Sequence, residues 1–257
     1  MEVIRHHEEV MGTVVSFDVR PGRCRGPAAR RGIRRACARL HRADAVFSIW
    51  KLESPLSRLR RGEISVNDGP RDLAEVLEQC AYARDVSGGW FDPWSIPGGV
   101  DPTGLVKGWA AQKALDDLVR AGIEAAMVNA GGDIAVTGGP EPGRPWRVGI
   151  RDPFERGGIL CVVETFGAVA TSGTYERGAH VLDPRTQRAA TGAVSATVVG
   201  PDLALADALA TGLVAAGERG MEAVVRLPGY SAMIVGDDGR PVSTDGFPVA
   251  DDVLVTV

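Results

Sequence analysis

Apolar residues along the chain follow two spacings, and each spacing predicts one kind of element. Alternating or β-branched runs predict strands, at about 10–19, 125–129, 133–137, 146–150, 159–164, 193–199, 231–235 and 253–257. Spacings of three and four residues predict helices, at about 27–46, 71–86, 107–121 and 202–216. Helices and strands do not alternate regularly, which disfavours a doubly wound parallel sheet. We therefore expect an α+β fold in which mixed or antiparallel sheets are flanked by helices, as one compact domain over residues 1–257.

Charge and composition narrow the class of protein. The chain has 257 residues, is 44% hydrophobic and carries a net charge of 29 − 33 = −4. That balance disfavours a dedicated nucleic-acid binder. The charge is uneven, since Arg20 to Arg39 contains eight arginines and no acid. This block is either a solvated helix face or a set of arginines close to a polyphosphate ligand.

The N-terminal residues contain no apolar run suited to a signal peptide, and no lipidation cysteine follows a short hydrophobic segment. No stretch approaches the roughly 20 apolar residues of a membrane helix. We expect a cytoplasmic protein without a membrane span.

Four cysteines, Cys24, Cys37, Cys80 and Cys161, stand far apart, with no C-x-x-C pair and no nearby histidine in metal-ligand spacing. We interpret them as reduced, mostly buried thiols.

One apolar helical segment, residues 201–217, carries an acid at Asp207 and a hydroxyl at Thr211. Residues four apart share one helix face, and the rest of this face is Ala, Leu and Gly. An unpaired buried carboxylate is costly and is usually met by a cation, and these oxygen donors suit Mg²⁺. The pattern favours a metal site, and the alternative is an aspartate bonded to a neighbouring loop.

The segment "VDPTGLVKGWAAQ" places Asp101 before a turn, Gly104 where the backbone can approach a partner, and Lys107 in the first turn of the predicted helix. A cation is disfavoured at a helix N-terminus unless an anion neutralises it. A diphosphate would supply that charge, and the alternative is a lysine that points into water.

Two further segments combine glycine with aromatic or apolar residues. "GGWFDPW" places Trp90 and Phe91 beside Asp92, either as aromatics that fill the core or as a platform for a planar ring with hydrogen-bond donors. "MVNAGGDIAVTG" predicts strand, glycine turn and strand, and lacks the spacing of a dinucleotide-binding fingerprint. The paired glycines allow a ligand or another strand to come close.

The run "AVATSGTYERGAHVLDPRTQ", residues 168–187, collects unusually many side-chain donors and acceptors. It contains His180, whereas His6, His7 and His41 lie in segments with no comparable polar company. A histidine among so many polar groups is a candidate acid or base.

These segments together, in their order along the chain, resemble the FAD:protein FMN transferases, the ApbE-type flavin transferase family. The resemblance runs from about Met11 to Gly217. It rests on "MGT", "FSIWKLESPLSRL", "FDP", "D-x-x-G-x-x-KGWA", "VNAGGDI", "VATSGTYERGAHVLDPRT" and "DALATGL". It implies an ApbE-like, T-fold-like domain.

The resemblance also implies a site. FAD, the substrate, would be held by Met11, Trp50, Trp90, Phe91, Asp92, Asp101, Lys107 and Leu182. Mg²⁺ would be held by the carbonyl of Gly104 and the side chains of Asp207 and Thr211. His180 would lie close to the reacting phosphate, so His180 and Asp207 are the expected catalytic residues.

The implied reaction transfers FMN from FAD to a threonine of an acceptor protein and releases AMP. The resemblance places that threonine in a short S/T-G-A-T-like context, which this chain does not contain. Two alternatives stay open: hydrolysis of FAD to FMN and AMP by the same pocket, and a non-catalytic FAD-binding protein.

Three features depart from the family pattern. Secreted members of the family carry a signal peptide or lipid anchor, and neither is seen in this sequence. The stretch between "FDP" and "VDPTG" is shorter than in many relatives. Trp50 stands where the family usually has a tyrosine.

Overall fold

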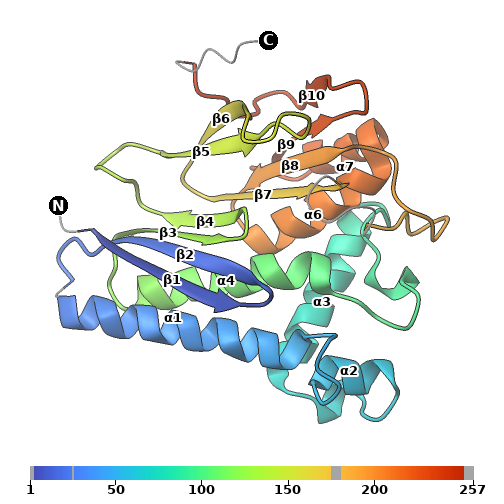
Figure 1. Ribbon diagram of the computed structural model, residues 1–257, viewed down its shortest axis with the longest axis horizontal. Coiled ribbons are helices and arrows are strands. Elements are labelled where there is room, and N and C mark those ends of the chain that lie inside the picture. The colour runs from blue at the N-terminus through green and yellow to red at the C-terminus, as the bar shows by residue number, and fades with distance from the viewer. Residues whose placement is uncertain (1–2, 25, 175–180, 252–257) are drawn as a thin grey trace.

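An antiparallel eight-stranded sheet forms the centre of the chain (Figure 1). The computed structural model describes residues 3–24, 26–174 and 181–251. Within this part the strand order is β1-β2-β3-β4-β7-β8-β9-β10. The bounds are β1 Ile4–Val10, β2 Thr13–Arg20, β3 Ala125–Ala130, β4 Asp133–Thr137, β7 Ala168–Gly173, β8 Ser195–Gly200, β9 Ser231–Val235 and β10 Pro241–Ser243.

The two faces of the sheet are covered differently. Helices lie on one side: α1 Gly26–Phe47, α4 Thr103–Arg120, α6 Leu203–Ala216 and α7 Met221–Val225 contact the sheet, and α2 Pro55–Arg60 and α3 Arg71–Val86 pack against other helices. Short 3₁₀ turns lie at Val66–Asp68, Pro93–Ser95 and Gly217–Gly220. On the other face a two-stranded ribbon of β5 (Trp146–Arg151) and β6 (Ile159–Thr165) packs against Ile134, Val169 and Val199 of the main sheet. The chain is therefore layered as helices, sheet and ribbon.

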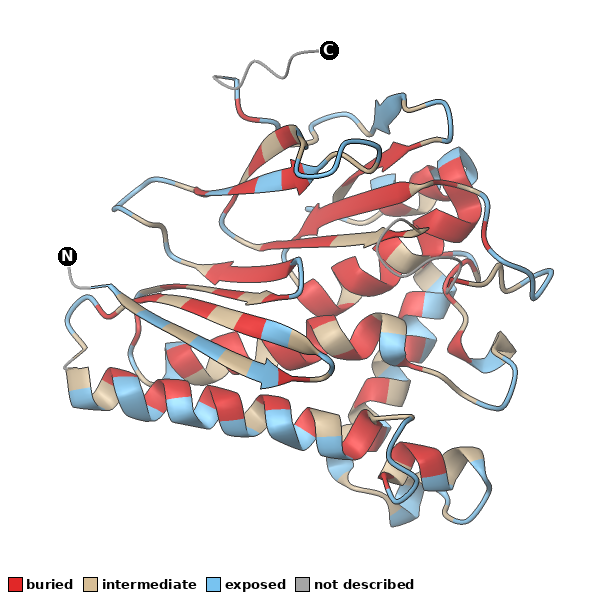
Figure 2. Cartoon of the chain, viewed as in Figure 1, coloured by how far each residue is buried: buried red, intermediate tan, exposed pale blue. Residues whose placement is uncertain are grey.

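Burial follows the periodicity of each element (Figure 2). Along β2, Val15, Phe17 and Val19 are buried and their neighbours are not, as expected for a strand with one covered face. Helix α1 buries a single stripe, and its outer face carries exposed arginines. Of the two interpretations of the arginine block, the solvated helix face is the one that fits. Helix α6 is buried almost all round and is the central helix of the core.

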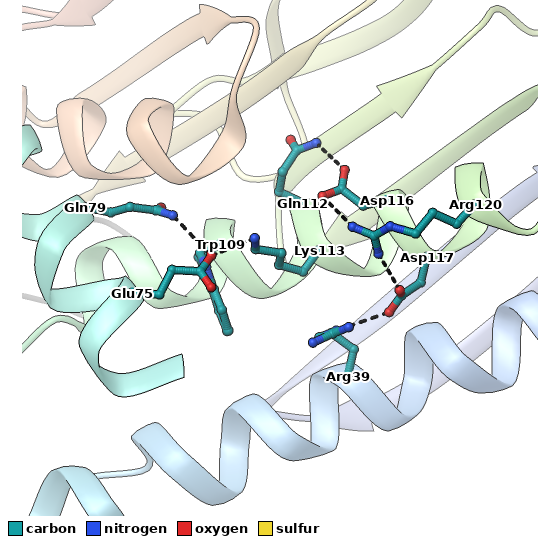
Figure 3. A network of polar contacts seen from close by, with 9 residues as sticks. All are labelled: Arg39, Glu75, Gln79, Trp109, Gln112, Lys113, Asp116, Asp117 and Arg120. Atoms are coloured by element: carbon teal, nitrogen blue, oxygen red, sulfur yellow. Dashed lines mark hydrogen bonds and ion pairs between the residues drawn. The ribbon is translucent and has the colours of Figure 1, made fainter. Parts of the chain in front are cut away.

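Polar contacts hold α4 between α1 and α3 (Figure 3). Glu75 on α3 accepts a hydrogen bond of 3.1 Å from Trp109 Nε1 and lies 2.6 Å from Lys113 Nζ. On the other side, Arg39 of α1 donates to Asp117 over 3.1 Å. These contacts fix the position of α4 along its length, and the N-terminal half of α4 carries site residues.

The α+β prediction with antiparallel sheets is confirmed, but several boundaries were wrong. Helix α4 begins at Thr103, because Asp101 Oδ1 accepts the Thr103 N–H at 3.0 Å and starts the helix early. Lys107 thus lies in its second turn. The strand expected at 10–19 is interrupted by a hairpin turn, in which Met11 and Gly12 have φ angles of 55° and 68°.

Some elements escaped prediction. Strands β1, β7 and β10 and helix α2 were not expected, because their polar residues or their shortness hide the apolar pattern. The strand predicted at 253–257 lies outside the described residues. Within the described ranges, no helix combines the length and apolarity needed to cross a membrane.

Candidate functional site

A buried carboxylate, Asp207 on α6, is at the centre of the candidate site. Asp207 is 3% exposed, and the backbone N–H of Gly108 on α4 donates to its Oδ2 over 2.9 Å. Burial raises the pKa of Asp207 well above its ordinary value, and the neighbouring Asp133 carboxylate raises it further, whereas Lys107 and the Gly108 N–H lower it. Such an environment stabilises a cation beside the carboxylate.

A second buried carboxylate completes this charge cluster. Asp133, the first residue of β4, is fully buried, and its Oδ2 lies 2.6 Å from Lys107 Nζ. The N–H of Thr171 on β7 donates to its Oδ1 over 3.2 Å. When both are ionised, Asp207 and Asp133 carry two negative charges, and Lys107 carries one positive charge. The cluster can therefore accept one further positive charge. Lys107 therefore does not simply point into water.

Glycines on α4 bring its backbone close to the donors on α6. A Cβ at Gly104 would lie 3.1 Å from Thr211 Oγ1, and a Cβ at Gly108 would lie 2.8 Å from Asp207 Cβ and 2.5 Å from the carbonyl oxygen of Leu203. Gly104 and Gly108 are one turn apart, as are Asp207 and Thr211, so the two helices meet along matching faces. Side chains at the glycines would fill the space next to the oxygen donors.

The polar strand β7 contributes a hydroxyl. Ser172 Oγ lies 3.2 Å from Thr211 Oγ1, and both are half-buried. On the opposite face of the sheet, Thr171 and Thr197 share a hydrogen bond of 2.9 Å between their hydroxyls. The described part of the run 168–187 thus borders the site through Ser172. His180 of that run lies outside the described residues.

Two hairpin turns lie beside each other next to this cluster. A Cβ at Gly131, in the β3–β4 turn, would lie 2.6 Å from Thr13 Oγ1, at the β1–β2 turn. Asp133 follows directly after the β3–β4 turn. The turn that contains Met11 is therefore held close to the strand end that carries Asp133, and Gly131 is required for close approach of these two turns.

Two of the three aromatic residues of "GGWFDPW", Trp90 and Phe91, are buried, whereas Trp94 is 43% exposed. Trp90 is 8% and Phe91 4% exposed. The guanidinium of Arg185 lies 3.6 Å from the Trp90 ring centroid. The Phe91 ring packs beside Gly104 of α4, since its Cε2 atom would lie 3.3 Å from a Cβ at Gly104. Both rings are packed in the core, and their contact with FAD is a prediction.

Other predicted contacts are spread more widely. Asp92 pairs with Arg84 at 3.1 Å and Asp101 with Arg60 at 3.4 Å, so both carboxylates already have a cationic partner. Trp50 is 88% exposed. The half-buried Leu182 pairs with Ala189 through an isolated bridge.

Sequence reasoning identified Gly104, Lys107, Asp207 and Thr211, and the structure brings these together. It missed Asp133 and Ser172, although both lie within the quoted motifs "VNAGGDI" and "VATSG". An acid that opens a strand directly after a glycine turn is a signal that could have identified Asp133.

Comparison with known proteins finds relatives named as flavin transferases. An FAD:protein FMN transferase of Rhodobacter capsulatus is 41% identical over 155 residues, which cover 56% of this chain and 29% of that protein. One of Vibrio cholerae is 38% identical over 134 residues, 48% of this chain and 40% of that protein. Both aligned segments therefore span less than half of the relative's own length.

Solved structures share the fold over nearly the whole chain. The flavin transferase ApbE from Vibrio cholerae has a TM-score of 0.81 at 24% identity and covers 96% of this chain and 98% of its own. The ApbE protein from Thermotoga maritima has a TM-score of 0.80 at 22% identity, with 96% and 98% covered. The sequence profile of the ApbE family matches residues 11–99 and 97–234. The chain therefore belongs to the ApbE family.

Proposed function

We propose that this protein transfers the FMN moiety of FAD to a threonine hydroxyl of a partner protein and releases AMP, with Mg²⁺ as its metal. The observation that carries the proposal is the buried cluster in which Asp207, Asp133 and Lys107 meet beside Thr211. The relatives named FAD:protein FMN transferase support the same reaction.

The donors fit a hard divalent cation. The Asp207 carboxylate and the Thr211 hydroxyl are oxygen ligands of the kind that Mg²⁺ takes. In a regular α-helix the Gly108 N–H would donate to the carbonyl of Gly104. Its donation to Asp207 competes with that bond, which favours the Gly104 carbonyl as a third oxygen ligand. When bound, Mg²⁺ would withdraw negative charge from the diphosphate oxygens of FAD.

The chain's own residues then have separate tasks. Lys107 faces the diphosphate as a fixed positive charge, and Asp133 holds its ammonium in place. The threonine oxygen attacks the FMN-side phosphorus, its bond to phosphorus forms as the bond to the AMP oxygen breaks, and its proton passes to a base. His180 is the proposed base, because an imidazole titrates close to neutral pH.

The remaining proposed FAD contacts are Met11, Trp50, Asp92, Asp101 and Leu182, with Trp90 and Phe91 as the packed wall behind the pocket. The exposed Trp50 ring offers a surface for stacking. The buried rings of Trp90 and Phe91 would contact FAD from the core side of the pocket, where the Phe91 ring packs beside Gly104.

The test uses purified protein, FAD, Mg²⁺ and an acceptor domain with a threonine in an S/T-G-A-T-like tetrapeptide. We expect flavin fluorescence on the acceptor in a denaturing gel and one AMP per flavin attached, and neither product with EDTA. The matched control acceptor carries alanine in place of the threonine. An unmodified acceptor with intact FAD would contradict the proposal.

A reaction without acceptor separates the alternatives. A hydrolase converts FAD to free FMN and AMP, whereas a transferase leaves most of the FAD intact, and chromatography distinguishes them. A non-catalytic binder would retain FAD without cleaving it in either reaction, and Asp207→Ala would bind FAD as well as the wild type.

A further inference from the structure

A second cluster of potential metal ligands lies between β1 and α1, on elements that the site at Asp207 does not use. His6 and Glu8 are two residues apart on the edge strand β1, and Cys37 and His41 are four apart on α1. Each pair therefore shares one face of its element. The register places His6 opposite Phe17 and Glu8 opposite Val15, which are buried residues, so this face of β1 is turned toward the helices.

The four side chains converge on Glu8. His41 Nε2 lies 2.6 Å from Glu8 Oε1, and His6 Nε2 lies 3.1 Å from Glu8 Oε2. A ring nitrogen of His6, a carboxylate oxygen of Glu8 and the sulfur of Cys37 all lie within 4.8 Å of one another. The His6 ring also packs on Phe17, with centroids 5.8 Å apart, which limits its rotation. The expectation that no histidine lies near a cysteine in metal-ligand spacing is wrong for Cys37 and His41, which are four apart on α1.

We propose that His6, Glu8, Cys37 and His41 form a binding site for Zn²⁺ or a similar thiophilic divalent ion, which clamps β1 to α1. Two imidazoles, one carboxylate and one thiolate are a ligand set that zinc accepts in tetrahedral geometry, whereas Mg²⁺ prefers oxygen donors alone. Tetrahedral zinc holds its ligand atoms roughly 3.3–3.8 Å apart. Small side-chain rotations would bring His6, Glu8 and Cys37, whose ligand atoms lie within 4.8 Å of one another, to that spacing, and His41 would join them from its position 2.6 Å from Glu8.

Charge and access also suit such an ion. Zn²⁺ with ionised Glu8 and Cys37 and two neutral histidines makes a complex without net charge. Cys37 is buried on the side of α1 that faces Glu8, so its sulfur would close the site from the core. The His6 and His41 side chains are 38% and 53% exposed, which leaves the ion a path from solvent.

The test is titration of EDTA-treated protein with Co²⁺, a spectroscopic substitute for zinc. We expect a thiolate-to-cobalt charge-transfer band, equimolar saturation, and loss of the band when Zn²⁺ is added. Cys37→Ser should abolish the band, and His41→Ala should weaken binding at least about tenfold. Zn²⁺ should raise the melting temperature of the wild type but not of His41→Ala, whose half-exposed side chain can be removed without disturbing the core.

Two controls keep this site separate from the proposed Mg²⁺ site. His7→Ala removes an exposed histidine on the same strand and should leave Co²⁺ binding unchanged. Asp207→Asn should also leave it unchanged while it impairs the transferase. The proposal is overturned if the wild type shows no thiolate band, or if His41→Ala and Cys37→Ser bind Co²⁺ as the wild type does. The cluster is then a set of hydrogen bonds centred on Glu8 and nothing more.

Discussion

Lys107 Nζ lies 2.6 Å from Asp133 Oδ2, which pairs a lysine of α4 with the fully buried carboxylate at the start of β4. This pair and the nearby Asp207 tie the central helices to the sheet through charge as well as through packing. Because both carboxylates are buried, changes to any one of the three groups leave a measurable charge imbalance.

Removal of the ammonium should destabilise the protein strongly. Lys107→Met leaves Asp133 buried without its cation, and we expect a loss of about 3 kcal/mol in the free energy of unfolding, measured with urea. The double variant Lys107→Met/Asp133→Asn should recover part of this loss, because the uncompensated charge is gone. Equal stabilities of the single and double variants would contradict an ionic role for the pair.

Asp207 should make stability depend on pH. Its folded-state pKa is raised above 3.8, so the folded protein holds a proton that the unfolded chain releases, and stability is lost as pH rises from 3.8 through the raised pKa. Without Mg²⁺ we expect Asp207→Asn to flatten this decline, since asparagine can still accept the Gly108 N–H. Thermal melts across the pH range measure the difference in slope between the two proteins.

Mg²⁺ should stabilise the wild type and not the Asp207→Asn variant. If Mg²⁺ binds the ionised Asp207, a concentration of about one hundred times its Kd should stabilise the wild type by about 2.7 kcal/mol and leave Asp207→Asn unchanged. Asp116→Asn, on the surface of α4, is the control for a lost negative charge. An equal response of all three proteins to Mg²⁺ would place the ion elsewhere.

The close crossing of α4 and α6 should not tolerate a side chain at Gly108. In Gly108→Ala the new Cβ would meet the Leu203 carbonyl oxygen at 2.5 Å, so we expect a loss of about 1–3 kcal/mol from forced separation of the helices. Gly26→Ala at the start of α1 is the matched control, because nothing lies within 4 Å of its Cβ position. Urea unfolding of both variants measures the contrast.

The Thr211 hydroxyl should matter for activity more than for stability. Thr211→Val keeps the shape of the side chain but removes the oxygen beside Ser172, and we expect AMP release to fall about tenfold or more, with a higher Mg²⁺ requirement. Thr211→Ser restores a hydroxyl and should recover most of the rate. A Thr211→Val enzyme with wild-type Mg²⁺ dependence would remove this residue from the proposed ligand set.

Local periodicity was enough to find the two helices that carry Lys107, Asp207 and Thr211. The apolar spacing located α6, and residues four apart on a helix necessarily share a face, so Asp207 and Thr211 were paired correctly before any tertiary information. The start of α4 was misplaced because its capping depends on the Asp101 side chain, and the polar strand β7 was missed because Thr171 and Ser172 do not alternate in hydrophobicity with their neighbours.

Tertiary structure alone decided which distant groups meet. Asp133 reaches Lys107 because the β3–β4 turn ends at the point where α4 crosses the sheet, and Glu8 reaches Cys37 and His41 because the register of the edge strand turns it toward α1. The physical reason is that periodicity fixes how residues a few positions apart are oriented. Contacts across tens of residues depend on strand register and helix packing, which are properties of the folded chain as a whole.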